Sequence, residues 1–212
     1  MGLYRKVLVG IFSRESESTY RWVTDLLTSP QFQPLVEDVR LVQVSNTMCG
    51  HSTQLGEEIA KCQFAILYHT NNRGRLNITN VTDSLYDEEL RHLSQKLGRE
   101  RIIVLVDDVN SDDPLVNSRL LNDQPLINEL SRLLIVMYKD EKSLYDQSGG
   151  GWRSDIGSYQ QGAKIQSKEK IQKMKSQISN AQELNTPLVL LISVLVVVSV
   201  ITIIAVCIWV RT

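Results

Sequence analysis

Five short apolar runs, rich in Val and Ile, recur along the first 139 residues of the chain. They lie at 6–12, 39–45, 64–70, 101–109 and 133–138. Strands that are apolar on both faces need cover on both sides, which is typical of a parallel sheet. The pattern therefore predicts five buried parallel strands.

The stretches between these runs change to a helical period. Apolar residues recur there every three or four positions, which predicts helices at 18–27, 55–62, 84–98 and 125–133. Alternation of strands and helices predicts an α/β fold, a five-stranded parallel sheet with helices on both faces and right-handed crossovers. The expected strand order is 2-1-3-4-5. We expect this domain to cover residues 1–139.

The composition changes after this domain. Residues 140–163 are rich in Gly, Ser and charge and predict a flexible linker. Residues 164–186 are basic, and their apolar positions have the a/d spacing of a coiled coil, at Ile171, Met174, Ile178 and Ala181. This segment predicts a juxtamembrane stalk helix, with weak self-association of two copies as the alternative.

The most apolar stretch of the chain lies at 187–210. No charged residue, Gly or Pro occurs from Leu188 to Val210, and Trp209 stands at its end. Such a stretch is long enough for a transmembrane helix, so we expect contact with a lipid bilayer and a short tail at 211–212. Its position resembles that of tail-anchored proteins. This resemblance implies a cytosolic α/β domain at the endoplasmic reticulum or later secretory compartments.

Charge and cysteine usage exclude several classes of protein. The formal net charge is −1, and no basic stripe with interleaved aromatic residues appears, so no nucleic-acid partner is expected. Three scattered cysteines favour neither a disulfide framework nor a zinc site, and no metal site is predicted. Two sequons, at Asn77 and Asn80, would favour a lumenal domain instead, and whether they are glycosylated stays open.

Candidate chemistry is expected where the strands end, because ligands of open α/β sheets bind beyond the carboxyl ends of the strands. The first such loop carries Ser13 and Glu15 but lacks the glycine motifs of phosphate-binding loops. The loop after the third run carries His69, suited to acid–base work, and Arg73, suited to an anion. Helix capping and a tight turn are the structural alternatives for these two loops.

A pair of carboxylates follows the fourth run. Asp107 and Asp108 stand at a strand end, where paired carboxylates can act in catalysis or bind ligands. The catalytic candidates are therefore His69, Asp107 and Glu15, and the ligand-binding candidates are Ser13, Arg73 and Asp108. No motif requires a cofactor.

The layout of residues 1–139 resembles the flavodoxin-like superfold. In length and strand order it is similar to TIR-like signalling domains, some of which cleave NAD with a glutamate on the helix between the third and fourth strands. Glu88 and Glu89 lie on the corresponding helix, without a matching motif. The segments "VLVGIFSR" and "TDSLYDEEL" also resemble an uncharacterised vertebrate family, which implies no activity.

Three functional hypotheses are compatible with these features. The leading one is a membrane-held α/β domain that serves as a protein-interaction or signalling module. The alternative is a membrane-bound hydrolase that binds a nucleotide or NAD at the carboxyl ends of the strands. The third is a lumenal protein that uses its sequons.

Overall fold

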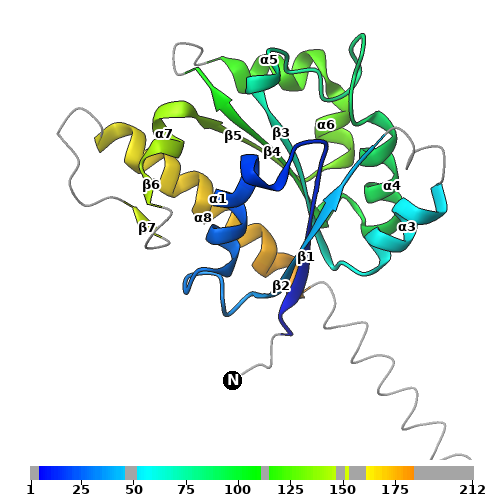
Figure 1. The fold of residues 1–212 in the computed structure, drawn as a ribbon, viewed down its shortest axis with the longest axis horizontal. Helices are drawn as coiled ribbons and strands as arrows, with labels where there is room; N and C mark the ends of the chain where they lie inside the picture. The colour runs from blue at the N-terminus through cyan, green and yellow to red at the C-terminus, as the bar shows by residue number, and fades with distance from the viewer. Residues whose placement is uncertain (1–4, 46–51, 111–114, 147–150, 153–160, 184–212) are drawn as a thin grey trace, which may run out of the picture.

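The computed structural model describes residues 5–45, 52–110, 115–146, 151–152 and 161–183. An α/β domain occupies most of this chain, with a central sheet and helices on both sides (Figure 1). The five strands of the sheet are β1 (Val7–Ser13), β2 (Val36–Gln43), β3 (Phe64–Thr70), β4 (Ile102–Val109) and β5 (Leu133–Tyr138).

The sheet has the predicted topology. All neighbouring strands are parallel, and their order is β2-β1-β3-β4-β5. Every residue of β3 and β4 is buried, as their uninterrupted apolar character predicts for strands covered on both faces. The parallel α/β sheet with a flavodoxin-like layout is therefore confirmed.

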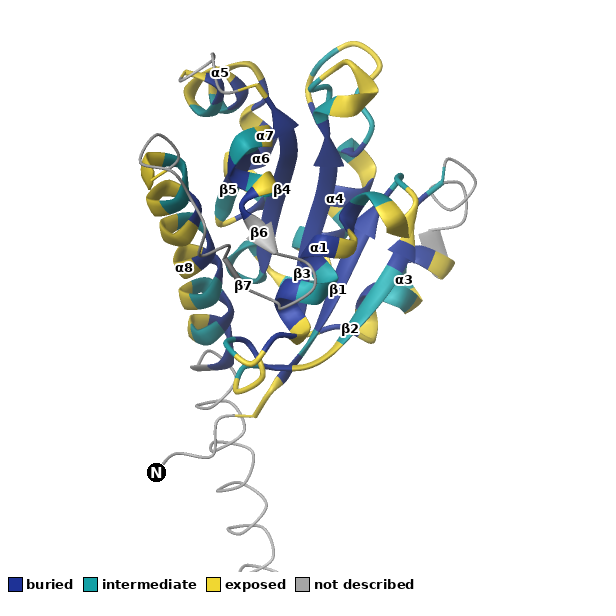
Figure 2. Cartoon of the chain, turned by 60° about the vertical axis from the view of Figure 1, so that its left-hand side comes forward, coloured by how far each residue is buried: buried dark blue, intermediate teal, exposed yellow. Residues whose placement is uncertain are grey.

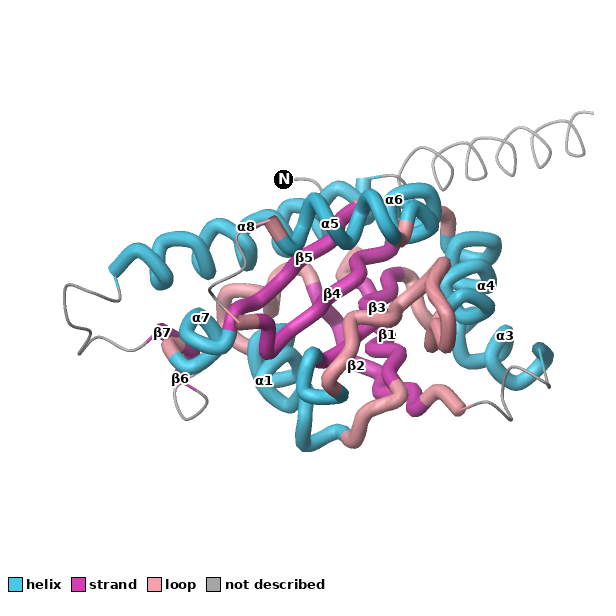
Figure 3. The backbone as a smooth tube through the Cα atoms, turned by 90° about the horizontal axis from the view of Figure 1, so that it is seen from above, coloured by secondary structure: helices cyan, strands magenta, loops and turns pink. Residues whose placement is uncertain are grey.

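The longer helices lie in two layers around this sheet. Figure 3, seen from above, shows α1 and α4 on opposite sides of the strands. The helices are α1 (Glu17–Thr28), α3 (Ser52–Ala60), α4 (Asp87–Leu97), α5 (Val116–Asp123), α6 (Pro125–Leu130), α7 (Lys139–Ser143) and α8 (Gln161–Glu183), with short 3-10 turns η1 (Asn71–Arg73) and η2 (Arg99–Arg101). The two-residue strands β6 (Tyr145–Asp146) and β7 (Gly151–Trp152) pair with each other.

Each face of the sheet has its own apolar core. On one face, residues of α1 and α8 pack against alternate strand residues such as Ile11, Ile66 and Ile103. On the other face, α3, α4, α5 and α6 cover the intervening positions, among them Leu67 and Val104. Alternate strand residues point to opposite faces, so each strand contributes to both cores.

Helix α8 corrects the expected stalk. Ile171, Met174, Ile178 and Ala181, whose spacing indicated a coiled coil, are buried in the same core as α1 and the sheet. In Figure 2 the exposed residues of α8 face away from the strands. Residues 161–183 therefore belong to the α/β domain, and the expectation of a separate stalk helix at 164–186 was wrong.

Polar contacts also fix α8 along the domain. The ammonium of Lys170 lies 2.6 Å from both carboxylate oxygens of Glu141 on α7 and 4.4 Å from the ring centre of Tyr138. Further along, Gln177 Nε2 donates to the carbonyl of Glu100 at 2.8 Å, and Gln182 Nε2 donates to the carbonyl of Leu35 at 3.0 Å. The helix is thus attached at three places along its length.

The rest of the predicted fold class also needs correction. The stretch at 187–210, which was expected to span a membrane, lies outside the described residues. Among the residues that are described, none of the helices has both the length and the apolar character needed to cross a bilayer. The fold observed in the described chain is therefore an α/β domain that includes α8, without the stalk and spanning helix of the prediction.

The substitution Met174→Ala is expected to lower the free energy of unfolding by about 2–5 kcal/mol, because a buried side chain is lost and a cavity remains. The Met174 side chain is 1% exposed within the core beneath α8. Denaturant unfolding followed by tryptophan fluorescence measures the change. The matched control is Lys173→Ala at the preceding, exposed position, for which we expect a change within about 0.5 kcal/mol. Equal effects of both substitutions would contradict the packing of α8.

Candidate functional site

The carboxyl ends of β1, β3 and β4 bring all six predicted site residues to one edge of the sheet. Ser13 ends β1 opposite Tyr68 of β3, and Thr70 of β3 lies opposite Asp107 of β4. Parallel strands place successive carboxyl ends side by side, which is why three separate loops meet here. The helices after β1 and β3 leave on opposite faces, so the edge includes the point where the topology switches direction.

The loop between β1 and α1 is held by its own polar groups. Ser13 is fully buried, and its hydroxyl donates to the carbonyl of Tyr68 at 3.2 Å and accepts from the Glu15 amide at 3.0 Å. The Ser13 hydroxyl therefore stabilises the chain as it leaves the strand. This arrangement is a structural turn of the kind that serine commonly makes.

An ion pair crosses the switch point. The guanidinium of Arg73, after β3, pairs with the carboxylate of Glu15, after β1. Arg73 Nη2 also donates to the carbonyl of Arg14 at 3.2 Å. These two predicted residues therefore meet, and they bind each other.

A second ion pair lies beside the first. Arg14 Nη2 is 2.6 Å from Glu89 Oε1, and both side chains are largely buried. The Arg14 guanidinium also lies 5.7 Å from the ring centre of Tyr86, whose hydroxyl accepts from the Arg14 amide at 3.1 Å. Glu89, one of the two glutamates considered from the TIR-like resemblance, thus holds an arginine, whereas Glu88 is exposed.

The carboxylates of Asp107 and Asp108 share one cation. Lys142 Nζ, on α7, lies 2.8 Å from Asp107 Oδ2 and 2.9 Å from Asp108 Oδ2. Asp107 is fully buried, and its Oδ2 also accepts from the indole of Trp22 at 2.9 Å. The two aspartates and the lysine form what we call the Asp107–Lys142–Asp108 triad.

Asp108 is the more exposed of the two aspartates and has further donors. Its Oδ2 accepts from Thr70 Oγ1 at 2.9 Å and from Asn72 Nδ2 at 2.8 Å. Its backbone has a φ of +56°, in the left-handed region, and the pairing of β4 with β5 is irregular between Val106 and Val109. The turn of the chain at this position directs the Asp108 carboxylate toward the ends of β3 and α7.

Burial and the neighbouring charges shift the pKa values of the triad in opposite directions. Burial raises the pKa of Asp107, although Lys142 and Tyr68 both act to lower it. Burial also acts to raise the pKa of Asp108, but its bonds to Lys142 and Thr70 outweigh burial and hold that pKa below its ordinary value. Burial acts to lower the pKa of Lys142, yet the two carboxylates keep that pKa above its ordinary value. Lys142 therefore stays charged and Asp108 ionised at neutral pH.

His69 is not a member of the triad. The ring is fully buried, its Nε2 lies 2.8 Å from the carbonyl of Arg75, and it meets the ring of Tyr86 edge-on at 5.9 Å between ring centres. A carbonyl accepts only, so Nε2 carries the proton. Burial lowers the pKa of His69, which favours the neutral ring.

Among the six candidate residues, two buried side-chain atoms lack a hydrogen-bond partner in the described part of the chain. They are Nδ1 of His69 and Oδ1 of Asp107. Nδ1 is an acceptor in the neutral His69 ring, and Oδ1 is an acceptor when the Asp107 carboxylate is ionised, so either atom could accept a hydrogen bond from a ligand. Among the six candidate residues, these two atoms are therefore the ones available for a hydrogen bond to a ligand.

Sequence reasoning missed Lys142, which neutralises the two aspartates. The residue falls in the segment that composition indicated as a linker, and nothing in its local pattern shows that it returns to β4. The one available signal was its position, because a charged segment that directly follows the last strand starts at the same carboxyl edge.

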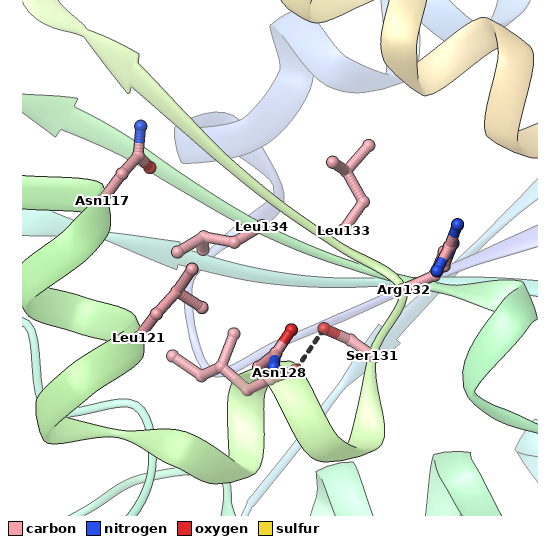
Figure 4. Close-up of a pocket in the computed structure, with 8 residues that line it drawn as sticks. Asn117, Leu121, Asn128, Ser131, Arg132, Leu133 and Leu134 are labelled. Atoms are coloured by element: carbon pink, nitrogen blue, oxygen red, sulfur yellow. Dashed lines mark hydrogen bonds between the residues drawn. The ribbon is translucent and has the colours of Figure 1, made fainter.

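Two cavities among the described residues lie away from the six candidate residues. One of about 210 Å³ lies among α5, α6 and the start of β5 (Figure 4), and one of about 400 Å³ is formed by the loop from Arg75 to Asp83. None of the six lines either cavity. In the described part of the chain, no cluster of three or more His, Cys, Asp or Glu side chains is arranged to hold a metal ion.

Comparisons with protein-family models, with curated proteins and with solved structures gave no match to this chain. What the candidate site can do must therefore be argued from its own geometry.

The substitution Lys142→Met is expected to destabilise the fold by about 3–5 kcal/mol at pH 7, because it leaves two carboxylates at the strand ends without their cation. Without the ammonium, the pKa of Asp107 rises further above its unfolded value of about 3.9. The folded variant then keeps a proton that the unfolded chain releases, so its stability falls as the pH rises above about 4. Denaturant unfolding at pH 3.5, 5 and 7 measures this trend.

Lys139→Met is the matched control for this prediction, since Lys139 is exposed on the same short helix. We expect it to change stability by about 0.5 kcal/mol or less. A loss in Lys142→Met that stays the same from pH 3.5 to pH 7 would show that the triad is not the cause.

The pH dependence of stability is also expected to report His69. Its folded pKa lies below the unfolded value of about 6.5, so stability is complete above that pH and is lost as the pH falls toward the folded pKa. His69→Gln removes this titration and should flatten the stability profile between pH 7 and pH 5. His92→Gln, on the surface of α4, is the control and should leave the slope unchanged. Equal slopes in all three proteins would refute the assignment.

Proposed function

We propose that this α/β domain is a protein-interaction module and not an enzyme. The observation that carries the proposal is the mutual pairing of charges at the carboxyl edge of the sheet. Glu15 binds Arg73, and Lys142 binds both Asp107 and Asp108. Groups that would act as a general acid, a general base or an anion clamp are thereby occupied by other side chains of the domain.

The resemblance to TIR-like signalling domains supports the same proposal. In the members that cleave NAD, a glutamate on the helix between the third and fourth strands acts on the substrate. Here Glu89 on α4 is 1% exposed and bound to Arg14. A buried carboxylate in an ion pair is stabilised in its position and withheld from a substrate. We therefore propose a signalling role that depends on binding rather than on catalysis.

A second candidate function has specific support in the two unpartnered acceptors. Asp107 Oδ1 and His69 Nδ1 are buried beside the switch point, where nucleotides bind in doubly wound α/β folds. A hydrolase that binds a nucleotide or NAD would use such groups. This candidate requires the Glu15–Arg73 pair or the lysine of the triad to move, because both occupy the same edge.

A thermal-shift experiment on the full-length chain separates the two candidates. The probes are ATP, GTP, NAD, FMN, Mg²⁺ and Mn²⁺. A ligand at 100 times its Kd would add about 2.7 kcal/mol, which corresponds to an increase in Tm of about 5–10 °C in a chain of this size. An interaction module is expected to show no such increase with any probe.

The test variants are Asp107→Asn and His69→Gln, which keep the approximate size of each side chain. An increase in Tm with a nucleotide that disappears in either variant would overturn the interaction proposal and establish a ligand site at the carboxyl edge. Release of a hydrolysed product by the unchanged chain, absent in the same variant, would identify the chemistry.

A further inference from the structure

Helix α7 contacts both α8 and the carboxyl end of β4, and Figure 1 shows it beside α8. Its Lys142 lies 2.8 Å from the carboxylate of Asp107 and 2.9 Å from that of Asp108. The preceding residue, Glu141, is bound by Lys170 of α8 at 2.6 Å. Two adjacent side chains of one short helix therefore connect α8 with the candidate site.

The pair between Glu141 and Lys170 holds α7 in its position. The Glu141 side chain is 1% exposed, and its Oε2 also accepts from the amide of Tyr138 at 2.9 Å. A carboxylate that is removed from water needs its cation, because an uncompensated buried charge is costly. Loss of Lys170 would therefore make the observed position of α7 unfavourable.

Helix α7 has little stability of its own. It comprises five residues, from Lys139 to Ser143, and isolated helices of such a length do not persist in water. Leu144, directly after it, is 2% exposed and adds an apolar contact. We call residues 139–144 the α7 strap. Its position depends on the contacts of Leu144, Glu141 and Lys142, and one of these three contacts is made with α8.

The α7 strap fills a site whose chemistry suits an ammonium group. Lys142 Nζ contacts Oδ2 of Asp107 and Oδ2 of Asp108, so the two carboxylates hold one cation in common. A separate observation is that Oδ1 of the fully buried Asp107 has no hydrogen-bond partner among the described residues. The site therefore has an acceptor that Lys142 does not use. Because the two Oδ2 atoms converge on one point, they favour a compact ammonium over a planar guanidinium.

We propose that the α7 strap is an autoinhibitory element, in which Lys142 fills a binding site for a lysine side chain of a partner protein. Helix α8 keeps the strap closed through the pair of Lys170 with Glu141. Displacement of the strap exposes Asp107 and Asp108 to the ammonium group of the partner. This inference rests on the proposed function as an interaction module, for which it names the surface, the class of partner and the regulation.

Chemical rescue of the full-length variant Lys142→Ala tests the ammonium site. The probe is propylammonium chloride, which replaces the lost ammonium and part of its stem. At ten times its Kd it should raise the Tm of the variant by about 3–6 °C. The unchanged chain, whose site is filled, should show no such increase. Tetramethylammonium chloride, which has no N–H donor, is the matched salt control, and Asp108→Asn in the same variant should abolish the rescue.

Acetylation of lysines by a succinimidyl ester, followed by mass spectrometry, tests the control by α8. In the unchanged chain, Lys142 should react more slowly than the exposed Lys139 of the same helix. Lys170→Met should raise the rate at Lys142 about tenfold or more, because Glu141 loses its cation. Lys168→Met, at an exposed position two residues earlier, is the matched control and should leave that rate within about twofold. Hydrogen exchange should show β3 and β4 still protected in both variants.

Other results would overturn the proposal in distinguishable ways. Equal effects of propylammonium and tetramethylammonium on Lys142→Ala would refute the ammonium site. If this variant does not fold alone, a cooperative thermal transition that appears with propylammonium only supports the site, and its absence in both salts refutes it.

An unchanged acetylation rate at Lys142 in Lys170→Met would refute the control by α8. Loss of protection in β3 and β4 at the same rate as exposure of Lys142 would show unfolding of the whole domain rather than release of the α7 strap. These results would leave the interaction module standing. Only a nucleotide-dependent increase in Tm, in the separate experiment above, would overturn the proposed function itself.

Discussion

Both faces of a parallel sheet must be covered by apolar side chains, and the structure of this domain depends on that constraint. β3 and β4 are buried throughout, so neither face can be left to solvent. On one face α1 is joined by α8, which packs its apolar side chains into the same core as Ile135 and Met137. Each such side chain contributes about 1.5–3 kcal/mol when it is removed from water. This requirement explains why a helix that follows a long, polar connection returns to the sheet.

The same topology concentrates charge where the strands end. Three loops converge on one edge, and the ionised groups there are partly removed from water. Buried charges need partners, because an unpaired ion in a protein interior is costly. The edge meets this need with the Glu15–Arg73 and Arg14–Glu89 pairs and with Lys142 between two aspartates. These contacts join the loop between β1 and α1, helix α4 and helix α7 to the strand ends, so the candidate site is also a structural junction.

The two edge strands of the sheet, β2 and β5, differ in composition for a related reason. β2 combines buried and exposed positions, and its charged side chains limit pairing along its outer side. The residues from Leu133 to Tyr138 follow the buried character of the inner strands, yet β5 has only one neighbour in the described chain. Its apolar composition is required by the two cores and leaves its outer edge without charged protection. The apolar composition of β5 thus follows from the packing on both faces of the sheet.

Local sequence patterns were sufficient to predict the strands, the order of the sheet and most of the helices between the strands, whereas α5 was not expected. Apolar residues recur with different patterns in buried strands and in amphipathic helices, and the right-handed crossover rule limits how these elements connect. Boundaries were less well determined: Ser84 was expected to open a helix, but its hydroxyl bonds to Asp87 and the helix begins at Asp87. The convergence of Ser13, His69 and Asp107 on one edge also followed from topology alone.

Only the tertiary structure decided what these residues contact. The spacing from Ile171 to Ala181 shows that one face of a helix is buried, but the same spacing suits a partner helix or a sheet, and here the partner is the sheet. Likewise, the sequence shows that Asp107 and Asp108 are adjacent, but not that Lys142 lies between them, 34 residues after Asp108. A local pattern records which side of an element is apolar or charged, whereas the identity of its partner depends on the path of the whole chain.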